Sequence, residues 1–118
     1  MSTKEIASRL VALCRQGKFE DAQKELFSTN AKSIEAEDSP MQPRETKGLD
    51  GIIAKGHEFQ ASVEKIHSMS ISEPLVAEDS FACTMTLDVT MKGRGRNTMS
   101  EVCVYDVRDG KITAEQFH

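Results

Sequence analysis

Glu101 is a carboxylate that stands among alternating apolar residues in the segment 99–107. Alternate residues of a β-strand lie on one face, so Glu101 is expected beside Cys103 and Tyr105 on an apolar surface. Burial there disfavours the charged carboxylate and raises its pKa, which makes the group useful for proton transfer near neutral pH. The alternative is a carboxylate at an open rim of the sheet, solvated or salt-bridged, because charged residues are rarely buried without a partner.

The last predicted hairpin decides which group lies beside Glu101. The Asp-Gly pair at 109–110 is typical of a two-residue turn, which pairs Val107 with Ile112. The same register pairs Glu101 with His118, and a carboxylate beside an imidazole can act as a proton-transfer pair. The match of Val107 with Ile112 favours this register.

A second register stays open, because Asp-Gly also suits a three-residue turn with a bulge at the glycine. It would place Phe117 beside Glu101 and Glu115 beside Cys103, with two carboxylates on the apolar face. Tyr105 lies about 13 Å from Glu101 along the strand, so its hydroxyl is expected to meet a ligand rather than Glu101. The candidate catalytic residues are Glu101, His118, Tyr105 and, in the bulged register, Glu115.

Other catalytic patterns are missing from the sequence. The three histidines are spread over a predicted helix, a strand and the terminus, and no cysteine lies two to four residues from a histidine or another cysteine. A glycine-rich phosphate loop and a nucleophile elbow are also missing. We therefore expect neither a metal nor a cofactor.

The elements that position these residues are helices first and strands afterwards. A capping box at 2–5 begins a helix that stops at Gly17, and apolar spacing predicts further helices over 19–26 and 49–66, the last with Phe59 on its apolar face. Two-residue periodicity predicts strands, and the longest loop is expected at 38–48. The strands are expected at 31–37, from Ser68 until Pro74 breaks the run, and at 81–91, 99–107 and 111–118. This order predicts an α+β fold.

The register of the first long hairpin follows from a turn centred on Arg94, which pairs Leu87 with Glu101. Cys83 then lies diagonally across from Cys103, so no disulfide is expected. A slip of two residues would keep the same faces, whereas a slip of one would mix apolar and polar sides.

Length and charge exclude several classes of protein. The 118 residues are enough for one domain, 1–118, and the net charge of −4 argues against a nucleic-acid or anionic-membrane surface. No apolar run approaches the ~20 residues of a membrane span, and the charged first residues do not fit a signal peptide. Three cysteines, an odd number in dissimilar contexts, indicate reduced thiols and a cytoplasmic location.

Several short motifs occur in a fixed order. They are Ser-Ile-Glu at 33–35, Thr-Lys-Gly at 46–48, Ile-Ala-Lys-Gly at 53–56, Leu-Asp-Val-Thr at 87–90, Met-Ser-Glu-Val at 99–102, Asp-Gly-Lys-Ile at 109–112 and Glu-Gln-Phe at 115–117. In this order and spacing the sequence resembles the SnoaL-like (polyketide cyclase-like) branch of the nuclear transport factor 2-like superfamily. The catalytic patterns of that superfamily's ketosteroid isomerases and epoxide hydrolases do not map cleanly onto the sequence, so the enzyme class does not carry over.

The resemblance implies a cone-shaped fold, with N-terminal helices packed in a strongly bent, mostly antiparallel sheet around an apolar pocket. It also implies a homodimer formed through the sheet, whose Thr-rich outer face carries Val102 and Val104. The residues expected to line the pocket are Phe59, Met85, Leu87, Met99 and Cys103.

Three functions are compatible with this sequence. The first is a cofactor-free isomerase, cyclase or hydrolase that acts on a small apolar carbonyl compound by proton transfer, with Glu101 as the acid or base. The second is a non-catalytic binder or sensor of an apolar small molecule, because Met and Cys suit an adaptable binding surface. The third is a dimeric interaction module. An acid on an otherwise apolar face favours a pocket function.

Overall fold

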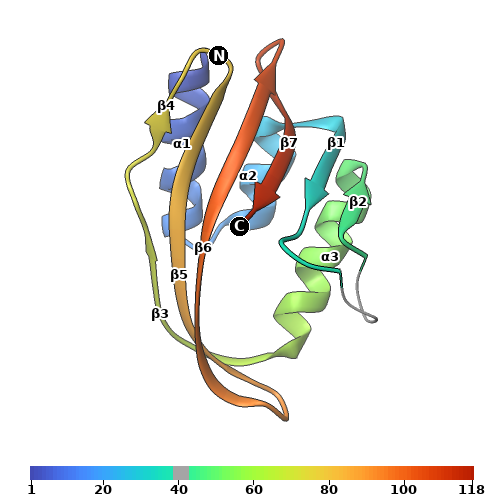
Figure 1. Cartoon of the computed structure of the whole chain (residues 1–118), viewed down its shortest axis with the longest axis vertical. Helices are drawn as coiled ribbons and strands as arrows, with labels where there is room; N and C mark the ends of the chain where they lie inside the picture. The colour runs from blue at the N-terminus through green and yellow to red at the C-terminus, as the bar shows by residue number, and fades with distance from the viewer. Residues whose placement is uncertain (39–42) are drawn as a thin grey trace.

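The computed structural model describes residues 1–38 and 43–118, so part of the predicted loop 38–48 lies outside the described residues. The fold is α+β, with a curved sheet that the helices cover on one face (Figure 1). The helices are α1 (Thr3–Arg15), α2 (Phe19–Leu26) and α3 (Leu49–Ser62), and the strands are β1 (Phe27–Ile34), β2 (Glu45–Lys47), β3 (Val63–Ile71), β4 (Leu75–Val76), β5 (Ser80–Met91), β6 (Gly95–Arg108) and β7 (Lys111–Phe117).

The predicted start and end of the first helix are confirmed. The Ser2 hydroxyl accepts a hydrogen bond from the Glu5 backbone N–H, and the Glu5 carboxylate accepts one from the Ser2 N–H. This capping box satisfies two backbone donors that a helix start leaves free. Gly17 follows the helix at φ +76°, a left-handed conformation that favours glycine.

The strand order in the sheet is β2-β1-β7-β6-β5-β3, and β4 also pairs with β5. Every pair is antiparallel except β1–β7, which is parallel. The β5–β6 hairpin runs along the whole molecule in Figure 1, with α1 and α2 behind its upper half and α3 beside its lower half. The face turned toward the helices is called the inner face below, and the opposite one the outer face.

Three of the differences between the predicted boundaries and the structure arise from strand pairing. The third helix ends at Ser62 rather than residue 66, because residues 63–66 pair with β5 as the start of β3. The strand predicted at 31–37 begins already at Phe27, directly after α2, and lies between β2 and β7. Residues 45–47, predicted as loop, form the edge strand β2. All three differences involve partners that are distant in the sequence.

The predicted register of the first hairpin is wrong by two residues. The turn is centred on Gly93 rather than Arg94, and glycines at φ +75° and +81° (Gly93 and Gly95) form it. Glu101 therefore lies opposite Met85 rather than Leu87. The shift of two keeps each residue on its predicted face, but Cys83 now lies directly opposite Cys103 instead of diagonally.

The second hairpin begins as predicted and then changes register. Asp109 (φ 52°) and Gly110 (φ 73°) form a two-residue turn, and Val107 pairs with Ile112. Thr113 then adds one residue to β7, because Asp106 pairs with Ala114. A bulge inside a strand, rather than at the turn, is what sequence reasoning did not foresee.

This bulge makes the predicted pairing of Glu101 with His118 wrong. The backbone N–H and C=O of His118 bond to Val102 at 2.9 and 3.0 Å, so His118 is level with Val102 and not with Glu101. Glu115 turns to the inner face, as the bulged register required, but it lies opposite Tyr105 rather than Cys103. Phe117 is the residue opposite Cys103.

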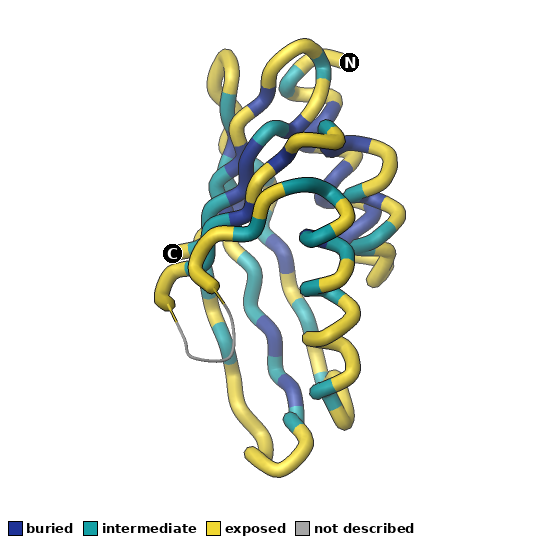
Figure 2. Tube along the Cα trace, turned by 90° about the vertical axis from the view of Figure 1, so that its right-hand side faces the viewer, coloured by how far each residue is buried: buried dark blue, intermediate teal, exposed yellow. Residues whose placement is uncertain are grey.

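The core lies where α1 and α2 cover the sheet, as the buried segments in Figure 2 show. Phe81 and Tyr105 stack there with ring centroids 4.8 Å apart. The α3 half is less filled, because Ile52 is the buried residue of that helix. No helix among the described residues is long and apolar enough to cross a membrane.

Candidate functional site

Glu115 is the most deeply buried carboxylate among the described residues, with 5% of its surface exposed. It lies opposite Tyr105 of β6 and level with Ser33 of the parallel strand β1. Burial raises the pKa of Glu115 to about 7, and the nearby Glu35 and Glu101 carboxylates raise it further, whereas a hydrogen bond from Ser33 lowers it. Glu115 can therefore both accept and donate a proton near neutral pH.

Lys55 of α3 is the cation of this site. Its Nζ donates hydrogen bonds to Ser33 Oγ and to Glu35 Oε1, both at 2.6 Å. The Lys55 side chain is 14% exposed, and its Nζ also lies 5.6 Å from the centre of the Phe117 ring. Its charge lowers the pKa of Glu115 and so opposes the effect of burial.

Glu101 is half-buried on the inner face of β6, at the next inner position beyond Cys103. Burial raises the pKa of Glu101, with a smaller contribution from Glu35, and Lys55 opposes both. The direction agrees with the expectation from its apolar neighbours. We call Ser33, Glu35, Lys55, Glu101 and Glu115 the carboxylate cluster.

Tyr105 is buried beside this cluster, and burial raises the pKa of its hydroxyl well above the usual 10, with a further contribution from Glu115. The phenol therefore stays protonated and is a hydrogen-bond donor at every physiological pH. His118, by contrast, is exposed and pairs with Val102. The structure thus brings Glu115 beside Tyr105, places Glu101 on the same inner face four residues from Tyr105 along β6, and leaves His118 outside.

The other residues expected to line a pocket differ in how far they are buried. Leu87 and Cys103 are buried, whereas Met85 and Met99 are half-buried. Phe59 of α3 is 38% exposed. The part of the sheet next to α3 therefore offers apolar side chains that the protein itself does not fully cover.

Sequence reasoning missed Ser33, Glu35 and Lys55. Ser33 belongs to β1 and Glu35 follows the end of that strand, which reaches Glu115 only through the parallel β1–β7 pair, and Lys55 reaches both from α3. Neither helical nor strand periodicity marks such a contact, since it joins three separate segments of the chain. Their one signal was their place in the motifs at 33–35 and 53–56.

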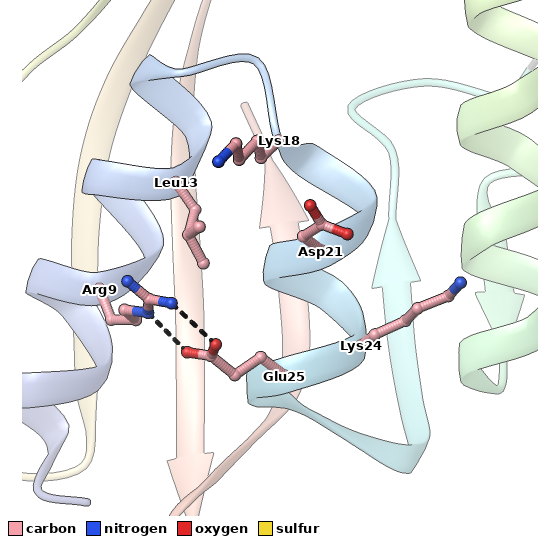
Figure 3. A pocket seen from close by; sticks show the side chains of 6 residues that line it. All are labelled: Arg9, Leu13, Lys18, Asp21, Lys24 and Glu25. Atoms are coloured by element: carbon pink, nitrogen blue, oxygen red, sulfur yellow. Dashed lines mark hydrogen bonds and ion pairs between the residues drawn. The ribbon is translucent and has the colours of Figure 1, made fainter.

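A separate pocket of about 450 Å³ lies between α1 and α2, away from the cluster (Figure 3). Its charged side chains largely offset one another, and Arg9 donates two hydrogen bonds to the Glu25 carboxylate at 2.7 and 3.0 Å. Its lining residues are Arg9, Leu13, Lys18, Asp21, Lys24 and Glu25. None is a residue that the sequence predicts as functional, and we assign this pocket no chemistry.

The described part of the chain contains no cluster of three or more His, Cys, Asp or Glu side chains arranged to hold a metal ion. Glu35, Glu101 and Glu115 share one region without converging on a single point that a cation could occupy. What the arrangement does offer is a carboxyl group that titrates near neutrality, a second carboxyl with a raised pKa, and a phenol donor.

Comparison with solved structures shows that this is the nuclear transport factor 2-like fold, the class that also includes ketosteroid isomerase-like folds. A family model described as the SnoaL-like domain matches residues 1–118, so the chain belongs to the SnoaL-like family. A search of curated proteins gives no match.

Three solved structures illustrate the similarity. A Mesorhizobium loti protein, described as a candidate SnoaL-like polyketide cyclase, is 34% identical, with 100% of this chain and 99% of that chain covered and a TM-score of 0.93. An NTF2-like protein of unknown function from Burkholderia pseudomallei is 15% identical (TM-score 0.81, 100% and 91% covered). A Catenulispora acidiphila protein with a ketosteroid isomerase-like fold, in complex with trimethylamine, is 19% identical (TM-score 0.74, 99% and 86% covered).

Proposed function

We propose that the protein catalyses cofactor-free proton transfer on a small apolar carbonyl compound held against the inner face of the sheet, with Glu115 as the acid–base group. The observation that carries this proposal is the position of Glu115, buried directly opposite Tyr105, with a pKa of about 7. A carboxyl group with such a pKa has both of its protonation states well populated at neutral pH.

The roles follow from the charges of the groups. Ionised Glu115 takes a proton from the carbon next to the substrate carbonyl, and the neutral Tyr105 hydroxyl donates a hydrogen bond to the oxyanion that develops. Glu115 then returns the proton to the same or another carbon of the substrate. Lys55 and Ser33 favour the ionised form of Glu115, so they keep the base available in a buried place.

Glu101 supplies a second, less buried carboxyl group on the same face. Its raised pKa favours a protonated fraction that can donate a hydrogen bond or a proton to the substrate. Met85, Met99 and Phe59 are the partly exposed apolar side chains that an apolar substrate would cover. A small apolar compound is therefore the substrate class that fits this surface.

A non-catalytic binder of an apolar molecule is the second candidate. The half-buried Met85 and Met99 favour it, because methionine side chains adapt to ligands of different shape. In that case the carboxylate cluster would set affinity and its pH dependence, and no turnover would depend on Glu115.

The two candidates differ in a proton-exchange experiment. The protein is incubated in D2O with a panel of 1,3-diketones and β,γ-unsaturated ketones of increasing apolar size, and the loss of proton signals next to the carbonyl is followed by NMR. We expect the wild type to accelerate exchange for at least one compound. Glu115→Gln should lower that rate by about 100-fold or more, whereas Glu58→Gln, which changes an exposed carboxylate of α3, should not.

Two outcomes would contradict catalysis by Glu115. Exchange that survives Glu115→Gln would exclude it as the acid–base group. Binding of a ketone, seen as shifts of protein resonances without accelerated exchange of any compound, would favour the non-catalytic binder.

A further inference from the structure

Cys83 of β5 and Cys103 of β6 lie directly opposite each other, and both are buried free thiols. Val102 exchanges both of its backbone hydrogen bonds with His118, so the N–H and C=O of Val102 point toward β7. Those of the next residue, Cys103, therefore point toward β5. The two cysteines form a hydrogen-bonded pair of an antiparallel ladder, in which the Cα atoms are about 5.5 Å apart.

This spacing suits a covalent bond between the two sulfur atoms. Disulfides span Cα–Cα distances of roughly 4.4–6.8 Å, and both side chains must project from the same face. Cys83 and Cys103 share the inner face, since residues opposite each other in a ladder lie on one side of the sheet. A disulfide can form here without a change in strand register.

The two thiols are chemically unequal. The interaction between the two thiols lowers the pKa of Cys83 and raises that of Cys103, burial raises the pKa of both, and Arg15 favours the Cys83 thiolate. The third cysteine, Cys14 of α1, differs, because burial raises its pKa to about 12. Oxidants react with thiolates rather than thiols, so the lowered pKa favours Cys83 as the sulfur that is oxidised first.

We propose that Cys83 and Cys103 are a thiol–disulfide site, joined across the β5–β6 hairpin when the protein meets a peroxide. Hydrogen peroxide transfers one oxygen to Cys83 to give a sulfenic acid and one water. The Cys103 sulfur then attacks the Cys83 sulfur, the S–S bond forms, and a second water leaves with the sulfenic oxygen. Two thiols and one peroxide thus give one disulfide and two waters, and Cys14 remains a thiol.

The two cysteines lie on the same inner face of the sheet as the carboxylate cluster. Cys103 is the inner-face residue between Glu101 and Tyr105, and Phe117 lies opposite it on β7. The disulfide would therefore fix two strands of the sheet directly beside the acid–base groups. The proposal does not depend on catalysis, because it rests on the two opposed thiols and not on the acid–base groups.

The test is peptide mapping of the full-length protein. Folded, fully reduced protein is treated with hydrogen peroxide, or in parallel with diamide, which oxidises thiols without transferring oxygen to methionine. Remaining thiols are alkylated after unfolding, and the chain is cut with trypsin without reduction. The three cysteines fall in separate tryptic peptides, 10–15, 66–92 and 97–108.

We expect one cross-link, between peptides 66–92 and 97–108, with Cys14 fully alkylated. Cys14→Ala should keep the cross-link, Cys83→Ser should abolish it, and wild type oxidised in urea should give all three pairings. A cross-link that includes Cys14, a link between two molecules, or three alkylated thiols after both oxidants would overturn the proposal. Mapping of the wild type alone decides it if a variant fails to fold.

Discussion

Glu115 lies directly opposite Tyr105 in the β6–β7 pair, and the single extra residue Thr113 puts it there. Without that bulge, Ala114 would be level with Tyr105, and Glu115 would turn toward the outer face. An insertion of one residue thus decides whether the inner face has a deeply buried carboxyl group.

The first prediction concerns stability and pH. The pKa of Glu115 is raised from 4.5 to about 7, so the folded state keeps a proton that the unfolded chain releases between these values. The stabilisation is complete below the unfolded pKa and is lost as the pH rises through 7; it amounts to roughly 3 kcal/mol at 1.36 kcal/mol per pKa unit. Glu115→Gln should remove this part of the pH dependence.

Urea unfolding followed by circular dichroism from about pH 5 to about pH 8 measures the effect as a difference between wild type and variant. The pKa of Glu101 is also raised, so Glu101 makes the free energy of unfolding fall with rising pH in both proteins. The difference between wild type and variant therefore reports on Glu115. An identical pH dependence in the two proteins would mean that Glu115 is not a buried titrating group.

The second prediction concerns Lys55. Lys55→Met removes the cation that holds Glu35 and that opposes the raised pKa of Glu115. We expect a loss of roughly 2 kcal/mol in the free energy of unfolding, because two charge-assisted hydrogen bonds disappear from a largely buried place. The pKa of Glu115 should rise further, measured from the pH titration of its side-chain carboxyl resonance by NMR.

Lys24→Met is the matched control, because Lys24 forms an ion pair with Glu20 on the surface of α2. An exposed pair of this kind contributes about 0–1 kcal/mol, so the control should be close to wild type. Equal stability losses in the two variants, or a fall in the pKa of Glu115 after Lys55→Met, would contradict the role given to Lys55.

The third prediction concerns Ser33, which is fully buried and bonds on one side to Lys55 and on the other to Glu115. Ser33→Ala removes a donor that favours the charged carboxylate, so the pKa of Glu115 should rise. The free energy of unfolding should fall by about 1–2 kcal/mol near neutral pH. Ser28→Ala, on the same strand, should leave the Glu115 titration unchanged; a shift there too would show that the effect is a general loosening of β1.

The fourth prediction concerns the outer face. We expect a homodimer formed through this surface, where Val102 is 42% exposed beside the threonines of β5. Val102→Lys should convert the dimer to a monomer, as measured by size-exclusion chromatography with light scattering. Val76→Lys is the control, because Val76 is 41% exposed but lies opposite Phe81, on the inner face of the sheet. A wild-type monomer, or dissociation by the Val76 change alone, would exclude this interface.

Much of the fold was predictable because its signals are local. The capping box, Gly17, the two-residue Asp-Gly turn and the alternation along β5 each act within a few residues, and each appears as expected. The register of the β5–β6 hairpin was less predictable, since the four residues Gly93, Arg94, Gly95 and Arg96 allow more than one turn centre. The two-residue alternation still predicted correctly which side chains lie on each face of the sheet. The error of two residues therefore changed the cross-strand partners but not the faces.

The candidate site was only half predictable. Glu101 and Tyr105 stand out as polar groups in an apolar alternation on one strand. The position of Glu115 depends on a bulge that no local sequence pattern marks. Lys55 of α3 bonds to Ser33 of β1, and Ser33 lies level with Glu115 in the parallel β1–β7 pair. Contacts of that kind are set by tertiary packing, which periodicity does not encode.

The parallel β1–β7 pair also has a consequence for the order of folding. The α1–α2 helices and the β5–β6 hairpin need only near neighbours in the chain, so they can form early. Ser33 and Glu115 meet only when β7 closes the long span back to β1, the step with the largest loop-closure cost. A chain that has formed only its helices and its long hairpin would therefore lack the Ser33–Glu115 contact, and the buried carboxyl group is in place only once the sheet is complete.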